Sequence, residues 1–382
     1  MPNLKREKKM LEKNFPHPSW IEIDLNQLKK NIQIIKKNLK KSLFCFPVKA
    51  NAYGHGICPV AKAAEDAGVD YLAVAHLAEA IKLRQSNINL PILILGAIHE
   101  DQIIDAINYE FEFTISSKFK ADLVAEKCQK IQKKCRVHIE VDTGMQRTGV
   151  RTSSAALLYE YLKKLSCFEI VGIYSHFANS DTPSDPITQK QLDAFLSLKK
   201  NPIFQNSSLI WHIANSGGVV FFPQSHLDMV RSSLITFGYL PDNYPSSFQG
   251  IAPCYAVKSK ISYFKVVAHN EGISYGHTYV TKKQTRIVTV PVGYGDGYRR
   301  GLSNKGSVLI RGEKFPIVGN ICMDQFMVDI GNCAAYVGDE VTLIGKQGKE
   351  EITIKEMAGL CDTSIYEVLC FFNDRLKRIY LK

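Results

Sequence analysis

The 382-residue sequence has no apolar run of membrane-spanning length, and its basic N-terminus, MPNLKREKKMLEKNFPHP, lacks the apolar core of a secretory signal. These two absences argue against a membrane or secreted protein, so we expect a cytoplasmic one. Ten cysteines are scattered without any C-x-x-C pair, which removes the commonest zinc and redox-dithiol patterns and favours free thiols. The sequence therefore predicts no metal site.

The formal net charge of +11 would suit a protein that binds nucleic acid or an anionic substrate. However, the lysines are spread along the whole chain and are not gathered beside aromatic residues. A binding surface for nucleic acid needs a concentrated basic patch. We therefore expect a small-molecule substrate and no nucleic acid partner.

Short apolar runs alternate with amphipathic segments whose apolar positions recur every three or four residues, such as KFKADLVAEKCQKIQKK and PITQKQLDAFLSLKK. The runs, which we interpret as strands, are 43–48, 71–74, 91–95, 111–114, 136–141, 168–175, 208–212 and 226–230. Regular β-α alternation predicts a parallel sheet, and eight units in roughly 200 residues favour a closed (β/α)₈ barrel. No G-x-G-x-x-G follows any run, which argues against an open dinucleotide-binding sheet.

After Gly238 the sequence LPDNYPSSFQGIAP has the composition of a linker, and the pattern beyond it changes to β-type runs separated by Gly and Asn turns. We therefore predict a basic tail at 1–19, a barrel at 20–240 and a mostly β domain at 241–382. The run WIEIDL at 20–25 precedes the first β-α unit, and we expect it to pair with the β domain.

Active sites of such barrels lie at the carboxyl ends of the strands. The polar residues that follow the predicted strands are Lys49, Asp142, Arg147, His176, Asn215, Ser216 and Arg231. One lysine in such a place is usually a solvated charge, but polar groups after five strands favour catalysis. The amine of Lys49 could form a Schiff base with a substrate carbonyl or with pyridoxal phosphate. The segment HIANSGG at 212–218 lies where barrels commonly bind phosphate.

Several long motifs resemble, in order and spacing, those of the pyridoxal-phosphate alanine racemases. They are VKANAYGHG, VDTGMQRTG, SHFA, HIANSGG, MVRSSL, SYGHTYV, VGYGDGY, VGNICMDQFMVDI and SIYEVLC, and they extend from about residue 20 to the end of the chain. The resemblance implies a (β/α)₈ barrel followed by a β domain, pyridoxal 5'-phosphate as cofactor, and a homodimer with shared active sites. It also implies that the enzyme supplies D-alanine for peptidoglycan synthesis.

The resemblance assigns two bases, because the α-proton must leave one face of the substrate and return on the other. Lys49 holds the cofactor and serves one face, and Tyr275 of the partner subunit serves the other. A tyrosine hydroxyl is a weak base, and His176 with Arg231 are the residues implied to activate it. Arg231 also faces the pyridine nitrogen; a guanidinium only donates hydrogen bonds, so that nitrogen stays unprotonated and transamination is suppressed.

Further residues follow from the same resemblance. The cofactor-binding residues would be Tyr53, Asn215, Ser216, Tyr366 and the backbone N–H groups of Ser233 and Leu234; Arg147 and Met323 would bind the substrate carboxylate, with Glu140 and Asp324 in support. Two positions depart from the family pattern: Glu140 replaces a lysine that is often carbamylated, and Ser233 replaces a glycine. If Glu140 turns inward with His138, its carboxylate could still pair with Arg147.

Two other classes of function remain. A pyridoxal-phosphate carrier shares this barrel but lacks a β domain, so residues 241–382 with Tyr275 argue against it. A decarboxylase or aldolase would act on larger amino acids, whereas Lys49 and Tyr275 together with the bulky Tyr366 favour a small substrate. Serine remains open as a side substrate, because an apolar pocket rejects an added hydroxyl only about a hundredfold.

Overall fold

The computed structural model describes residues 17–205 and 207–382, so most of the tail that we predicted at 1–19 lies outside the described residues. The chain forms two compact units. Unit 1 combines the chain up to Asp24 with Tyr53–His55 and Cys254–Lys382, and unit 2 consists of Leu25–Ala52 and Gly56–Pro253. The chain therefore passes from one unit to the other several times.

Unit 2 is built on a parallel sheet. In its described part the strand order is β10-β2-β3-β4-β5-β6-β8-β9, with the short β7 beside β6. The bounds are β2 (Leu43–Pro47), β3 (Tyr71–Val74), β4 (Ile92–Ile94), β5 (Glu112–Ile115), β6 (Cys135–Asp142), β7 (Val150–Arg151), β8 (Phe168–Tyr174), β9 (Ile210–His212) and β10 (Met229–Arg231). Backbone hydrogen bonds from Asp228 to Trp211 and from Arg231 to Ala214 bring β10 beside β9, which nearly closes the barrel. The predicted barrel is confirmed.

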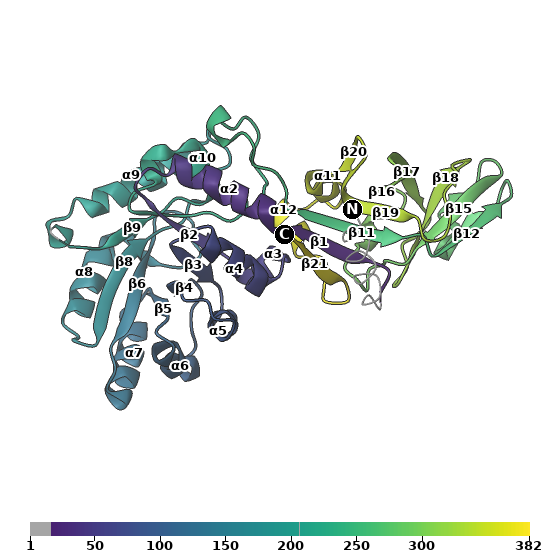
Figure 1. Cartoon of the computed structure of the whole chain (residues 1–382). Helices are drawn as coiled ribbons and strands as arrows, with labels where there is room; N and C mark the ends of the chain where they lie inside the picture. The colour runs from purple at the N-terminus through teal and green to yellow at the C-terminus, as the bar shows by residue number, and fades with distance from the viewer. Residues whose placement is uncertain (1–16, 206) are drawn as a thin grey trace. The chain divides into compact units, whose positions relative to one another are not determined.

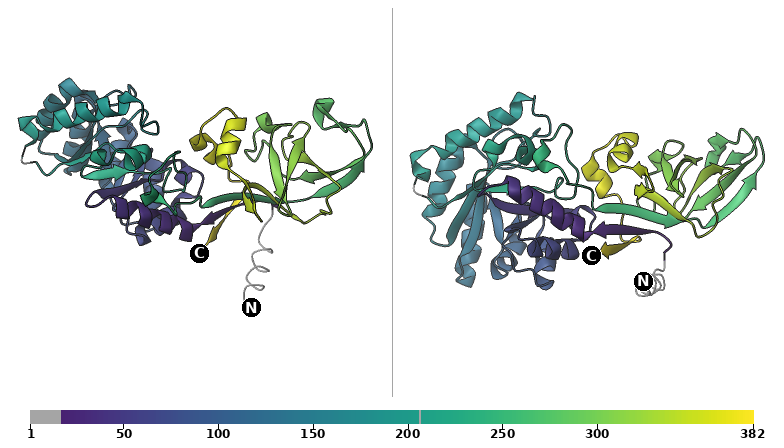
Figure 2. Two further views of the ribbon diagram at one scale, coloured as in Figure 1. Left: turned by 90° about the horizontal axis from the view of Figure 1, so that it is seen from above. Right: turned by 45° about the horizontal axis from the view of Figure 1, so that its top comes forward.

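Helices lie outside these strands (Figure 1), and the views in Figure 2 show the same layering in unit 2. They are α2 (Leu25–Asn38), α3 (Lys49–Tyr53), α4 (Ile57–Asp66), α5 (Leu77–Gln85), α6 (Ile103–Asn108), α7 (Lys118–Ile131), α8 (Thr152–Lys163), α9 (Pro186–Lys199) and α10 (Ser216–Phe221), with 3-10 turns at Glu100–Gln102, Pro202–Phe204, Pro223–Ser225 and Ser246–Phe248. In α2 the buried residues Leu28, Ile32 and Ile35 recur at the helical period and face inward. No helix in the described ranges is long and apolar enough to span a membrane.

The interior of the barrel has an apolar side and a polar side. The apolar side is a cluster from β2, β3, β4 and β10: Cys45, Tyr71, Ala73, Leu93 and Met229, with Leu43, Leu95 and Ile210 packed against it. The polar side comes from β5, β6, β8, β9 and β10 and consists of Glu112, Thr114, His138, Glu140, Tyr174, His212 and Arg231, all buried. Because buried polar groups need hydrogen-bond partners, this side must be internally paired.

Unit 1 is mostly β, as predicted. Its main sheet has the order β12-β15-β18-β17-β16-β19-β11-β1-β21, with β20 beside β19. The bounds are β1 (Trp20–Asp24), β11 (Tyr255–Lys260), β12 (Tyr263–Val267), β13 (Gly272–Ile273), β14 (Tyr279–Val280), β15 (Thr285–Val290), β16 (Ser307–Ile310), β17 (Glu313–Val318), β18 (Phe326–Gly331), β19 (Glu340–Gln347), β20 (Glu350–Ile352) and β21 (Lys377–Leu381), with helices α11 (Ile354–Leu360) and α12 (Ile365–Leu369) and 3-10 turns at Tyr275–His277 and Arg300–Leu302. Strand β1 lies between β11, to which it is antiparallel, and β21, to which it is parallel. The two ends of the described chain therefore meet in one sheet (Figure 1).

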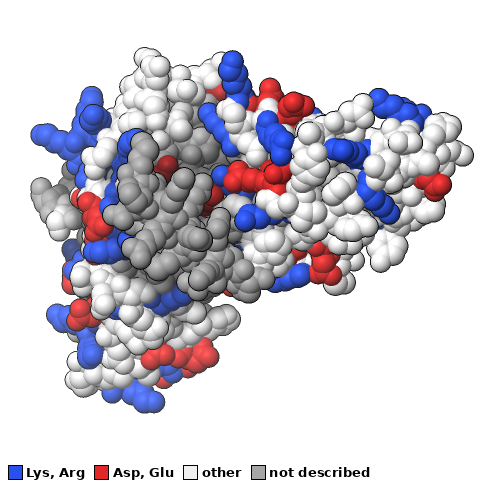
Figure 3. Space-filling model, turned by 45° about the vertical axis from the view of Figure 1, so that its right-hand side comes forward, with Lys and Arg blue, Asp and Glu red and all other residues white. Residues whose placement is uncertain are grey.

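The charged side chains are mixed on the surface. On the face shown in Figure 3, Lys and Arg side chains alternate with Asp and Glu side chains and do not form one continuous patch. The Lys and Arg side chains on that face therefore form no concentrated basic surface.

Candidate active site

Lys49 begins a left-handed turn at the carboxyl end of β2. All four residues of 50–53 have φ between 51° and 55°, a region that costs a non-glycine residue roughly 1–2 kcal/mol. The turn is held by side chains: Glu79 accepts a hydrogen bond of 2.6 Å from the backbone of Ala50, and the amide oxygen of Asn51 accepts one of 2.9 Å from Ile57. Strain of this kind, held by surrounding contacts, is concentrated at functional sites. The turn fixes where the Lys49 amine leaves the strand.

The hydroxyl of Ser216 accepts hydrogen bonds from two backbone N–H groups. Its Oγ accepts hydrogen bonds from the N–H groups of Ser233 at 3.2 Å and Leu234 at 3.0 Å. Asn215 caps α10 by accepting from the backbone of Gly218. Ser233 does not have a positive φ, so the serine that replaces the family's glycine is accommodated without backbone strain. Two converging N–H groups beside a hydroxyl make a cradle suited to an anionic oxygen.

Arg231, the last residue of β10, is buried and faces His176. Its Nη2 donates to the backbone oxygen of Ser175 at 2.6 Å and to Nδ1 of His176 at 3.2 Å. Burial, followed by the charges of Arg231, Arg147 and Lys49, lowers the pKa of His176 to about 3. The imidazole is therefore neutral, and the three cations around it give this end of the barrel a positive potential that favours anionic ligands.

Arg147 lies on the loop that follows β6. The loop is shaped by Asp142, whose Oδ1 accepts from the backbone of Gly144 at 2.8 Å and of Gln146 at 3.2 Å. Arg147 lines a cavity of about 630 Å³ formed by this loop and the start of α8. The structure thus places Arg147 on the same rim as Lys49, His176, Ser216 and Arg231.

The pairing of Glu140 with Arg147 that we considered is absent from the described residues. Glu140 does turn into the barrel with His138, but its carboxylate accepts a hydrogen bond of 2.8 Å from the hydroxyl of Thr148. The loop turns at Gly149, where a Cβ would lie 3.3 Å from the Glu140 side chain, and this close approach brings Thr148 to the carboxylate. Glu140 therefore anchors the loop that carries Arg147 and does not contact the guanidinium itself.

In unit 1 the structure brings Tyr53 and Tyr366 together. Their ring centroids are 6.0 Å apart, with the planes tilted by 49°. The close approach depends on Gly54, where a Cβ would lie only 2.1 Å from the backbone oxygen of Leu369 in α12. Arg378 of β21 fixes the same segment by donating to the Gly54 carbonyl at 2.6 Å.

Tyr275 and Met323 lie on neighbouring loops of unit 1 and are 73% and 54% exposed. Asn320 joins the loops: its side chain donates to the Tyr275 carbonyl at 2.7 Å, and its own carbonyl accepts from Ser274 at 2.6 Å. The carboxylate of Asp324 forms an ion pair of 2.8 Å with Arg375. Two large apolar side chains are therefore presented together on the surface of unit 1.

Comparisons with known proteins agree with this geometry. Residues 23–241 match the alanine racemase N-terminal domain, and residues 254–380 match the alanine racemase C-terminal domain. The chain belongs to the alanine racemase family. It is 39% identical to the alanine racemase of Symbiobacterium thermophilum, covering 95% of this chain and 97% of that protein, and 39% identical to that of Methanococcus maripaludis, covering 96% and 99%. The solved alanine racemase of Clostridium difficile 630 superimposes with a TM-score of 0.91 at 38% identity, covering 96% and 97% of the two chains.

The sequence did not predict that a group of buried polar residues inside the barrel would belong to the site. Glu112, His138 and His212 are joined by side-chain hydrogen bonds, and His212 reaches Arg231. The predicted site residues follow the strands, whereas these three residues lie within the strands. The available signal was the occurrence of Glu112 in FEFT and His138 in RVHIEV, polar residues inside runs that otherwise predict buried strands. Among residues 17–205 and 207–382, no three His, Cys, Asp or Glu side chains are grouped as a metal site.

Proposed function

We propose that this protein interconverts L-alanine and D-alanine with pyridoxal phosphate as cofactor, by a two-base reaction in a homodimer. The observation that carries the proposal is the combination, at one rim of the barrel, of the Ser216 cradle with the Arg231–His176 pair and Lys49. The match to both family domains supports the same reaction.

The residues present fit pyridoxal phosphate. Two backbone N–H groups converge on the Ser216 hydroxyl, which suits a phosphate oxygen, and three cations surround the neutral His176. In the described residues Nη1 and Nη2 of Arg231 are fully engaged with His212, Ser175 and His176, whereas Nε makes no hydrogen bond. Arg231 therefore keeps one directed donor for the pyridine nitrogen, while Lys49 would hold the cofactor and Tyr53 and Tyr366 would contact its phosphate.

When bound, the cofactor stabilises the negative charge that develops as the α-proton leaves. Lys49 would move that proton on one face and Tyr275 on the other. Because Arg231 can only donate a hydrogen bond, the pyridine nitrogen that it would face stays unprotonated. The negative charge at the α-carbon would then be less strongly stabilised and shorter-lived, which disfavours transamination. Arg147, with Met323, would bind the substrate carboxylate, and Glu140 and Asp324 would hold these two loops.

The exposed side chains of Tyr275 and Met323 support the homodimer. Large apolar side chains presented together on a surface mark interaction sites. We infer that these loops enter the active site of the partner subunit, where Tyr275 would serve as the second base. Ten thiols without a disulfide in the described chain suit a reducing compartment, so we place the enzyme in the cytoplasm and its D-alanine in peptidoglycan synthesis.

The test is to incubate the protein with pyridoxal phosphate and L-alanine in heavy water, following D-alanine and deuterium at the α-carbon. D-alanine that carries deuterium is the expected result. Deuterium exchange without inversion would mean that Lys49 acts alone and would contradict the role of Tyr275. Absence of both products would favour a carrier protein, and release of carbon dioxide would favour a decarboxylase. The same assay with L-serine measures the tolerance for an added hydroxyl.

A further inference from the structure

A continuous chain of hydrogen bonds crosses the barrel interior below the catalytic rim. Glu112 Oε2 lies 2.8 Å from His138 Nε2, His138 Nδ1 lies 3.0 Å from His212 Nε2, and His212 Nδ1 lies 2.8 Å from Arg231 Nη1. All four side chains are at most 4% exposed. Four strands, β5, β6, β9 and β10, thus contribute one residue each to a single buried path that ends at Arg231.

The chemistry of the two ends fixes every proton along this path. A guanidinium only donates, so Nδ1 of His212 must accept and its proton must lie on Nε2. That proton points to Nδ1 of His138, which must also accept, so the His138 proton lies on Nε2 and is donated to Glu112. Both rings are then neutral with the same tautomer, and each ring nitrogen has a partner.

The electrostatic environment agrees with this assignment. Burial, followed by the charge of Arg231, lowers the pKa of His212 well below 6.5, so that ring stays neutral. Burial alone would raise the pKa of Glu112, but the hydrogen bonds from His138 and Arg136 and the charge of Arg136 outweigh it, and the pKa falls below its usual value. An ionised Glu112 is an acceptor only, as the chain of protons requires.

The path is built into the barrel wall. Strand β8 lies between β6 and β9, so His138 reaches His212 only across β8. The residue of β8 at that point is Gly172, where a Cβ would lie 2.6 Å from His138 Nδ1 and 2.5 Å from the Ile210 oxygen. This position requires glycine because there is no room for a side chain, and not because of an unusual φ. On the other side Tyr174 stacks on His212, with ring centroids 5.0 Å apart.

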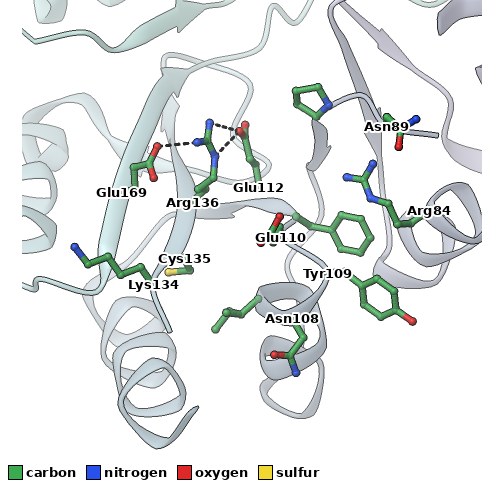
Figure 4. Close-up of a pocket in the computed structure, with 13 residues that line it drawn as sticks. Arg84, Asn89, Asn108, Tyr109, Glu110, Glu112, Lys134, Cys135, Arg136 and Glu169 are labelled. Carbon is green, nitrogen blue, oxygen red and sulfur yellow. Dashed lines mark hydrogen bonds and ion pairs between the residues drawn. The ribbon is translucent and has the colours of Figure 1, made fainter. Parts of the chain in front are cut away.

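The far end of the path opens into a cavity of about 870 Å³ at the amino ends of the strands. There Arg136 pairs with Glu112 through Nη2 at 2.8 Å and Nε at 3.0 Å, and with the exposed Glu169 through Nη1 at 2.8 Å. Figure 4 shows Arg136 held between these two carboxylates. Glu169 therefore carries the same charge and contacts the same arginine as Glu112, but has no bond to the histidines.

We propose that Glu112 is a positioning residue for Arg231, because its carboxylate fixes the protons of His138 and His212 and thereby the orientation of the guanidinium. With Nη1 and Nη2 held, the Nε–H of Arg231 points in one direction. The proposal rests on the proposed function in one respect, namely that Arg231 faces the cofactor nitrogen. If the protons were reversed, Nδ1–H of His212 would face an N–H of Arg231, and the two donors would repel one another.

The test compares Glu112→Gln with Glu169→Gln in the full-length protein. Proton-coupled nitrogen NMR of the histidine rings, with signals assigned from His138→Asn and His212→Asn, reads the tautomers directly in apoprotein and loaded enzyme. In the wild type both rings should carry their proton on Nε2. A glutamine amide at 112 can donate to His138, so E112Q should mix the two tautomers of both rings, whereas E169Q should leave them unchanged.

The kinetic consequence should follow the spectra. Replacing a residue that orients a histidine through a hydrogen bond commonly changes activity by about 10–100-fold. E112Q should therefore lower the kcat of alanine racemisation by about that factor, with little change in KM. Restoring the carboxylate in Glu112→Asp should recover the wild-type tautomers at least in part. E169Q should retain the wild-type kcat.

Three results would overturn the proposal: a wild-type ring that carries its proton on Nδ1, an E112Q protein with wild-type tautomers and kcat, or an equal loss of kcat in E169Q. The first does not depend on Glu112→Gln, so it stands even if that variant does not fold. A wild type that shows the expected tautomers but does not racemise alanine would contradict the proposed function and leave the proton assignment intact.

Discussion

Replacement of Gly172 by alanine tests the barrel packing and the buried path together, without altering any polar group. The new Cβ would lie 2.5 Å from the carbonyl oxygen of Ile210 and 2.6 Å from Nδ1 of His138, closer than real Cβ contacts, so one of them must move. The first belongs to the backbone of β9, and the second is held between Glu112 and His212. Neither can yield without breaking a hydrogen bond.

The magnitude follows from these contacts. Overpacking costs about 1–3 kcal/mol and the His138–His212 hydrogen bond contributes about 1 kcal/mol, while alanine recovers about 0.4–1 kcal/mol by restricting the unfolded chain. The free energy of unfolding should fall by about 1–4 kcal/mol, and each kcal/mol lowers the Tm by about 2–4 °C for a unit of this size. The kcat should fall as well, because Arg231 loses its support.

Scanning calorimetry, steady-state kinetics and the histidine spectra measure these effects. Gly359→Ala is the matched control, because a Cβ there meets nothing within 4 Å in helix α11, and alanine favours a helix over glycine by about 1 kcal/mol. Its Tm should be equal to that of the wild type or higher. If G172A kept the wild-type Tm and the wild-type His138 signals, the reasoning about the barrel interior would be refuted.

Four further outcomes are expected. Ser216→Ala removes the hydroxyl of the anion cradle, so the Kd for pyridoxal phosphate, measured by absorbance titration, should rise about tenfold or more; an unchanged Kd would exclude the cradle as the phosphate site. Lys49→Ala should allow gel filtration to remove the cofactor, and a variant that retains both cofactor and turnover would exclude Lys49 from the reaction. Tyr275→Phe should slow exchange of the L-alanine α-proton by about 10²–10⁴-fold with little effect on the Kd for the cofactor, and an equal loss in both would indicate a structural role. Burial and nearby cations lower the pKa values of His176 and His212 in the folded protein, so below about pH 6.5 the unfolded chain binds protons at these residues that the folded protein does not. Chemical denaturation should therefore show full stability above that pH and a loss at pH 5, to which His176 contributes about 2 kcal/mol. A free energy of unfolding that does not change with pH would contradict two neutral rings.

The fold was predictable because hydrophobic periodicity reports which faces are buried. The eight apolar runs all occur as strands of unit 2; β3 has the predicted bounds, whereas β10 begins three residues later than the run at 226–230. The difference arises because His226 and Leu227 belong to the turn before the strand, where Leu227 has a φ of 46°. Apolar composition marked the region, but turn geometry set its boundary.

Part of the candidate site was also predictable. Residues at the ends of strands, such as Lys49, Ser216 and Arg231, could be located because all parallel strands of a barrel expose their carboxyl ends on one rim. The Glu140–Arg147 pair could not be judged in this way, since it depends on which loop residue reaches the carboxylate. The structure gives that place to Thr148.

The sequence by itself determined the alternation of strands and helices in the barrel, the change to β-type runs beyond it and the polar residues that follow the strands, because each of these depends on local pattern and order. Only the tertiary structure decided the proton path from Glu112 to Arg231, because its residues come from four strands and meet across a fifth at Gly172. A side chain's partner across a barrel depends on register, twist and closure, none of which is a property of neighbouring residues. For the same reason, polar residues within apolar runs could be identified in the sequence, but their connection to Arg231 could not.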